Sequence, residues 1–241
     1  MDLAKGVAKS KKMTIILNLS TVFKYKSRFK PFWFIGSLWF SINSSASLPF
    51  SGTIIGDILT DNSIAVSCTS VVSDIEYTYP QLSASLFQRN SSTPLQSLSQ
   101  TWQVVCSAPV TALFLTVDTD QKSDSLLTSD PTRFGLGSVN GRGRLGYYQV
   151  TLNNATVDGS PVQLYQTSNA TQVGSPQSSV ILNSAVFQGW TRDGRLPARG
   201  QHYSVQLTVT PTLNSLQETQ GALVNGGELN GELILSFPFN Y

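Results

Sequence analysis

Apolar and polar residues alternate over several short stretches of the 241-residue chain. The alternation occurs in 102–107, 113–118 and 204–210, and the last of these is the clearest. Strict alternation is typical of a half-buried strand, whose successive side chains point to opposite faces of a sheet. After residue 46 no stretch has the sustained i, i+3, i+4, i+7 apolar spacing of a helix. We therefore predict many short strands and no long helix.

Turn-forming motifs separate these stretches. They contain Asn-Gly, Asp-Gly or Pro, which favour chain reversal, and they read SDPTR, VNGRG, NNATVDGSP, TRDGR and VNGGELNG. The polar stretch 168–179 is predicted to be an exposed loop. Many short strands with such punctuation favour an all-β fold of the β-sandwich type.

The first 46 residues differ from the rest in composition. They hold eight of the 16 basic residues and one acidic residue, and a twelve-residue apolar run, PFWFIGSLWFSI, follows at 31–42. A basic segment, a short apolar run and a small-residue cleavage site are typical of a secretory signal peptide, and twelve residues are too few to span a membrane. We expect a signal peptide at 1–46, with cleavage after Ala46 or Ser47 and with Met1 or Met13 as the start.

Removal of this leader changes the charge of what remains. Residues 47–241 hold eight basic and 13 acidic residues, a net charge of −5, and Lys122 is their one lysine. Nucleic acid is therefore not an expected partner, because phosphate binding needs clustered basic side chains. Both cysteines, Cys68 and Cys106, remain, and we expect them to form a disulfide in an oxidising compartment.

GRGRLG at 141–146 matches the G-x-G-x-x-G pattern of dinucleotide-binding turns. That motif requires a preceding strand and a helix that begins at the glycines. Here the following YYQVTL is β-branched and aromatic, so it favours a strand instead. We interpret GRGRLG as a tight turn between strands.

Catalytic and metal chemistry find little support in the sequence. His202 is the one histidine, and in QHYSVQLTVT it shares the polar face of a strand with Ser204 and Gln206. One histidine and two paired cysteines do not form a zinc site. We predict no enzyme activity, no metal and no cofactor. Trp190 in GWTRDGR is interpreted as a core residue, with stacking on a sugar as the alternative.

Both ends of the part that follows the leader are predicted to be extended strands with one apolar side. Near its start these positions are Leu48, Phe50, Gly52, Ile54, Gly56 and Ile58. At its end they are Leu229, Leu233, Leu235, Phe237, Phe239 and Tyr241. Pro238 lacks a backbone donor and favours an edge position for the second strand. An apolar edge strand promotes aggregation unless another strand pairs with it.

Four stretches together resemble the subunits of chaperone-usher fimbriae of Gram-negative bacteria, in particular a less characterised β-fimbria-like subunit family. They are GTII near the start of the part that follows the leader, TWQVVCSAP, RFGLGSVNGRGRLGYYQVTL and ELNGELILSFPFNY. The third stretch is the most specific, and its turn glycines are Gly135, Gly137, Gly141, Gly143 and Gly146.

The resemblance implies an immunoglobulin-like sandwich at 61–241 that lacks its last strand and is completed by a strand from another chain. It implies a disulfide between the first two strands, and it implies that 229–241 borders the groove and pairs with a periplasmic chaperone. Residues 47–60 would be a donor extension, or else the first strand of the domain itself. The implied partners are a chaperone, an outer-membrane usher and neighbouring subunits, in the periplasm and then at the cell surface. The alternative is a secreted glycan-binding sandwich or tip adhesin that recognises a host glycan or other surface receptor.

Overall fold

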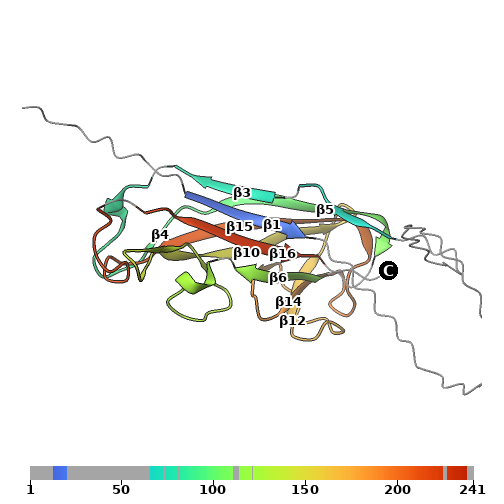
Figure 1. Cartoon of the computed structure of the whole chain (residues 1–241). Coiled ribbons are helices and arrows are strands. Elements are labelled where there is room, and N and C mark those ends of the chain that lie inside the picture. The colour runs from blue at the N-terminus through green and yellow to red at the C-terminus, as the bar shows by residue number, and fades with distance from the viewer. Residues whose placement is uncertain are drawn as a thin grey trace, which may run out of the picture. The chain divides into compact units, whose positions relative to one another are not determined.

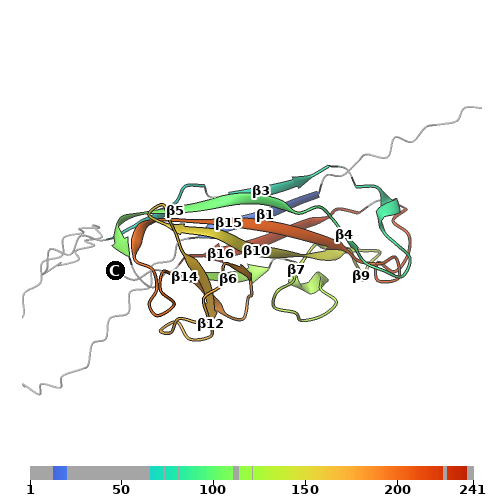
Figure 2. The same cartoon turned by 180° about the vertical axis from the view of Figure 1, so that it is seen from behind.

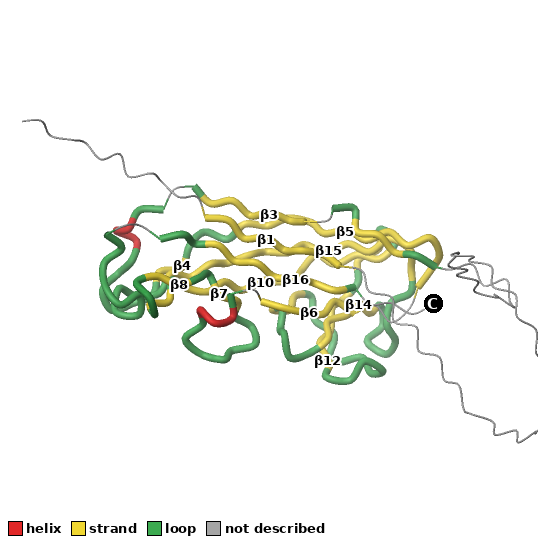
Figure 3. The backbone as a smooth tube through the Cα atoms, in the orientation of Figure 1, coloured by secondary structure: helices red, strands yellow, loops and turns green. Residues whose placement is uncertain are grey.

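The computed structural model describes residues 13–20, 66–72, 74–80, 82–110, 114–120, 122–224 and 227–237. Within these ranges the chain forms strands and two short 3-10 helices, as the alternating pattern predicts (Figures 1 and 3). The strands make two large sheets that face each other, so the all-β sandwich is confirmed. No helix among the described residues is long and apolar enough to cross a membrane.

The larger sheet has eight strands. Three long antiparallel strands, β10, β15 and β5, form its centre. Its main order is β11-β10-β15-β5-β2, with β13 and β7 paired to β10 and β4 paired to β15. Figure 2 shows β10, β15 and β5 of this sheet. The bounds are β2 Cys68–Ser70, β4 Thr93–Pro94, β5 Leu98–Val110, β7 Phe134–Gly135, β10 Gly146–Val157, β11 Ser160–Pro161, β13 Ser179–Ile181 and β15 Gly200–Leu213.

The other sheet has six strands in the order β12-β14-β6-β16-β1-β3. The bounds are β1 Met13–Ser20, β3 Asp74–Tyr79, β6 Phe114–Asp120, β12 Gln163–Thr167, β14 Phe187–Thr191 and β16 Asn230–Ser236. Its pairs are antiparallel except β1 with β16, which is parallel. The remaining elements are η1 Ala84–Leu86, η2 Ser123–Ser125 and the small hairpin of β8 Ser138–Val139 with β9 Gly143–Arg144.

An aromatic cluster joins the two sheets in the core. Trp102 of β5 lies 6.4 Å from Trp190 of β14 and 5.4 Å from Phe237, measured between ring centroids. Tyr203 of β15 contacts the same rings, at 5.9 Å from Trp190 and 6.0 Å from Phe237. All four side chains are buried. The alternation in 204–210 therefore reflects a strand with one face in this core.

The GRGRLG motif forms a tight turn, as interpreted from the sequence. Residues 140–142 connect β8 to β9, and Gly141 has φ of 80°. A Cβ atom at Gly143 would lie 2.2 Å from the carbonyl oxygen of Thr219, so only glycine lets these two segments approach so closely. The chain continues into strand β10 without a helix, which removes the N-terminal helix dipole that a pyrophosphate would need.

Two tyrosine hydroxyl groups tie β3 to the opposite sheet. The Tyr77 hydroxyl donates to the carbonyl of Leu207 at 2.7 Å, and the Tyr79 hydroxyl donates to the carbonyl of Val209 at 3.4 Å. Burial raises the pKa of Tyr79 to about 12 and raises that of Tyr77 as well, so both hydroxyl groups stay protonated near neutral pH. These two bonds fix how far β3 stands from β15.

Tyr77→Phe should lower the free energy of unfolding by about 1 kcal/mol, because it removes one buried hydrogen bond and leaves the acceptor carbonyl without that donor. Tyr79→Phe is the matched control and should cost less, since its hydrogen bond is longer. Urea unfolding followed by tryptophan fluorescence measures both. Equal losses for the two variants would contradict the role given to the Tyr77 hydroxyl.

Candidate functional site

The most informative feature of the smaller sheet is the strand position between β3 and β16. These two strands do not pair with each other, and β1 lies between them (Figure 1). β1 is in register with β16 from Thr14↔Asn230 to Ser20↔Ser236, and with β3 from Met13↔Tyr79 to Asn18↔Asp74. The segment that completes the sheet therefore comes from far upstream of both of its neighbours.

The β16 side of this position is strongly apolar. Leu233 and Leu235 are buried, as are Leu229 before the strand and Phe237 after it. Gly231 continues this inward row, and a Cβ atom there would lie 2.3 Å from Cε1 of Tyr148. The Tyr148 ring from the opposite sheet thus occupies the space that a side chain on residue 231 would need.

The β3 side matches it. Ile75, Tyr77 and Tyr79 are buried and alternate with exposed residues. Position 17 of β1 pairs with both Ile75 and Leu233. The odd-numbered positions of β1 are thus in register with the buried rows of both neighbours. Any segment that replaced β1 would need an apolar residue at every second position.

β16 is not an edge strand in this structure, contrary to the expectation from Pro238. It pairs with β6 on one side and with β1 on the other. The reason is that β1, which supplies the second neighbour, is remote in sequence. Pro238, Phe239 and Tyr241 lie outside the described residues, as do Leu48, Phe50, Gly52, Ile54, Gly56 and Ile58.

β1 is the part of this arrangement that sequence reasoning missed. Met13–Ser20 falls inside the segment expected to be a signal peptide, at 1–46, and the remainder of that segment lies outside the described residues. The stretch reads MTIILNLS, and its Ile15, Leu17 and Leu19 occupy alternate positions. That spacing is typical of a strand, but the surrounding lysines are typical of a signal peptide, and the segment was interpreted as a leader for that reason.

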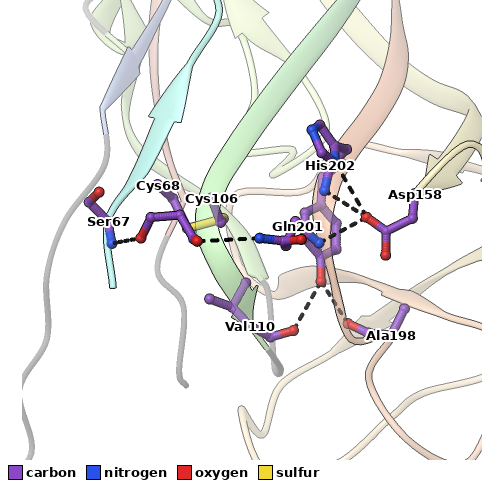
Figure 4. The surroundings of a disulfide bond; sticks show 10 residues. Ser67, Cys68, Cys106, Val110, Asp158, Ala198, Gln201 and His202 are labelled. Carbon is purple, nitrogen blue, oxygen red and sulfur yellow. Dashed lines mark hydrogen bonds and ion pairs between the residues drawn. A yellow bond between two sulfur atoms is a disulfide. The ribbon is translucent and has the colours of Figure 1, made fainter. Parts of the chain in front are cut away.

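The predicted disulfide is confirmed, and it joins two strands of the larger sheet (Figure 4). Cys68 of β2 and Cys106 of β5 are directly paired across the two strands. The backbone N–H of Ser107 donates to the carbonyl of Ser67 at 2.8 Å, which extends the pairing. The bridge anchors β2, and the chain then crosses to the other sheet as β3.

His202 is exposed on the polar face of β15, as predicted. Its Nδ1 lies 3.6 Å from Oδ1 of Asp158, which also accepts the backbone N–H groups of Gln201 and His202 at 2.9 Å each (Figure 4). Burial raises the pKa of Asp158, but these hydrogen bonds outweigh it and the net shift is downward. The Asp158 carboxylate thus links the end of β10 to the start of β15.

Other chemistry that the sequence raised receives no support from the described residues. Trp190 is buried in the aromatic cluster, so its interpretation as a core residue is confirmed and sugar stacking by this ring is wrong. Among the residues that the structure describes, no three His, Cys, Asp or Glu side chains are grouped so that they could hold a metal ion. The sugar-stacking alternative failed because the sequence does not reveal which face of β14 is covered.

Comparison with known proteins identifies no family for this chain. No protein-family model matches the chain, and no curated protein is significantly similar to it.

Proposed function

We propose that the chain is a structural subunit of a chaperone-usher fimbria, or a fimbria-associated protein, with a role in adhesion. One observation carries the proposal: the strand between β3 and β16 lies upstream of the predicted cleavage site. Cleavage after Ala46 would remove β1 and would leave the rest of the sandwich without this strand. The resemblance of residues 47–241 to fimbrial subunits implies the same gap.

The gap would be costly to leave open. Seven residues of β16 and six residues of β3 are paired to β1 in register, and their backbone groups on that side would lose these partners. Ile75, Tyr77, Leu233 and Leu235 would meet water along the same edge. Two unpaired apolar edges form a template for strand addition by another chain.

The chain itself holds a segment suited to fill the gap of a neighbouring subunit. Residues 48–58 carry apolar residues or glycine at every second position, which is the pattern that the buried rows of β3 and β16 require. A periplasmic chaperone would fill the gap before assembly, and an outer-membrane usher would guide the exchange. The function requires neither a catalytic residue nor a cofactor.

Chains that begin at residue 47 should form strand-linked multimers, whereas chains that begin at residue 61 should not. The physical reason is that only the longer chain has both the gap and the segment to fill it. The measurement is gel electrophoresis in SDS without heating, because completed sandwiches of this type should dissociate slowly. A peptide with the sequence of residues 47–60 should then bind the shorter chain and raise its unfolding temperature.

A peptide of the same composition with residues 47–60 in scrambled order serves as the control and should not bind. The proposal is wrong if the shorter chain is a stable monomer whose unfolding temperature the peptide does not change. It is also wrong if mass spectrometry of the exported chain finds residues 13–20 still attached, because β1 would then complete the sheet permanently.

A further inference from the structure

A polar pocket lies at the end of the sandwich where the loop after η1 and the loop after β15 meet. Its volume is about 680 Å³, within the range usual for small-ligand sites. Residues from three separate loop segments line it, namely 90–92, 126–128 with Arg133, and 214–215 with 217–218, together with Gly146 and Tyr147 at the start of β10. We call it the loop-end pocket. None of its lining residues belongs to β1, β3 or β16, so it is independent of the strand position described above.

The segment 214–218 is held firmly in place. Asn214 and Ser215 are buried, and the Asn214 amide donates from Nδ2 to the carbonyl of Arg144 at 3.2 Å. Oε2 of Glu218 accepts from both the backbone N–H and the hydroxyl of Ser215, at 2.9 Å and 3.1 Å. The Glu218 N–H donates back to Oγ of Ser215 at 3.3 Å. These reciprocal hydrogen bonds hold segment 214–218, which forms one wall of the pocket, in a fixed conformation without a ligand.

The opposite wall is also fixed. The Arg133 guanidinium lies over the Tyr147 ring at 4.3 Å, and its Nε lies 3.1 Å from Oδ2 of Asp130. Hydrogen bonds from the N–H and hydroxyl of Thr132 hold the pKa of Asp130 below its usual value, so its charge balances that of Arg133. Directly after this loop the chain enters β7, where Oδ2 of Asp120 at the end of β6 accepts the Gly135 N–H at 3.0 Å.

The lining determines the chemistry of a ligand. Arg133 and Glu218 are the two charged side chains among the described residues that line the pocket, and each is already engaged by a neighbour. The other side chains are mainly hydroxyl and amide groups, with two leucines and the Tyr147 ring. Balanced charge disfavours a phosphate or another strong anion, which needs unpaired basic groups. Many donors and acceptors beside a few apolar surfaces fit a compound with many hydroxyl groups.

We infer that the loop-end pocket binds a neutral oligosaccharide, with Thr128 and Gln217 among the side chains that contact its hydroxyl groups. Both residues line the pocket and are exposed. Sugar hydroxyl groups both donate and accept, as do the threonine hydroxyl and the glutamine amide. A preformed wall limits the entropy lost on binding and so favours affinity.

The test is binding of the exported protein to a printed array of neutral and acidic oligosaccharides, followed by calorimetry with the best neutral compound. Ser92 is exposed and lines the pocket, so Ser92→Trp places a large side chain there and should weaken binding at least tenfold. Ser168→Trp, on an exposed loop that does not line the pocket, is the matched control and should bind as the parent protein does. Thr128→Ala with Gln217→Ala should weaken binding about tenfold without changing the unfolding temperature.

Three results would overturn the inference. The first is an array on which the folded protein binds no neutral oligosaccharide. The second is equal affinity for Ser92→Trp and Ser168→Trp, which would place the sugar elsewhere. The third is binding confined to sialylated or sulfated compounds, which would require an anion site. Multimer formation through residues 47–60 is measured separately, so failure here leaves the proposed function unaffected.

Discussion

Leu17→Pro in the chain of residues 1–241 should lower the free energy of unfolding by roughly 3 kcal/mol or more. Residue 17 is in the middle of β1, paired with Ile75 on one side and Leu233 on the other. Proline has no backbone N–H, so an inner strand loses a ladder hydrogen bond, and the ring also disturbs the neighbouring strand. The loss should spread to both β3 and β16, because β1 joins them.

Leu17→Val is the matched control, since it keeps the backbone donor and should cost much less. Both proteins are folded under oxidising conditions, and their masses are checked so that residues 1–46 are known to be present. Guanidinium unfolding is then followed by the fluorescence of the buried Trp102 and Trp190. The same unfolding midpoint for the two variants would contradict the placement of β1 inside the sheet.

Replacing both cysteines, as Cys68→Ala with Cys106→Ala, should lower the free energy of unfolding by about 4 kcal/mol. The bridge joins residues 38 positions apart, and in the chain-entropy model its loss enlarges the freedom of the unfolded chain by that amount. The effect should be severe here because β2 is three residues long and has little pairing of its own. Without the bridge, the crossing from β2 to β3 loses its anchor.

Ser107→Ala is the control for local damage near the bridge. It removes the acceptor of the Ser67 N–H, at 3.0 Å, but it leaves the covalent link in place. Its cost should be about 1 kcal/mol or less, because the bond is exposed. Urea unfolding of the three proteins, with and without reductant, separates the two effects. A double cysteine variant as stable as Ser107→Ala would show that the bridge contributes little.

The local sequence pattern predicted much of this fold, because the alternation of apolar and polar residues in a strand reflects which of its faces is buried. The alternation at 204–210 identified the buried row of β15, and the aromatic and β-branched run after GRGRLG identified β10. The turn at 140–142 followed from its Asn and Gly residues. The cysteine pairing followed from there being two cysteines and an expected oxidising compartment. Each of these inferences needs no knowledge of which strands are neighbours.

The position of β1 could not be predicted in the same way. Its alternating leucines and isoleucines fit a strand, but the nearby lysines and the apolar run fit a leader equally well. Local spacing does not say which of two distant edges a strand joins, or whether the pairing is parallel. The loop-end pocket was equally hidden, since residues 90–92 and 214–218, which both line it, are more than 100 residues apart along the chain.

The sequence by itself determined that this protein is built of short strands, that Cys68 and Cys106 pair, and that 140–142 is a turn. These are properties of a residue and its near neighbours. The tertiary structure alone decided that Trp190 is covered, that β16 is an inner strand while β1 is present, and that three loops enclose one polar pocket. Those outcomes depend on contacts between distant segments, whose free energy appears only when the two sheets come together.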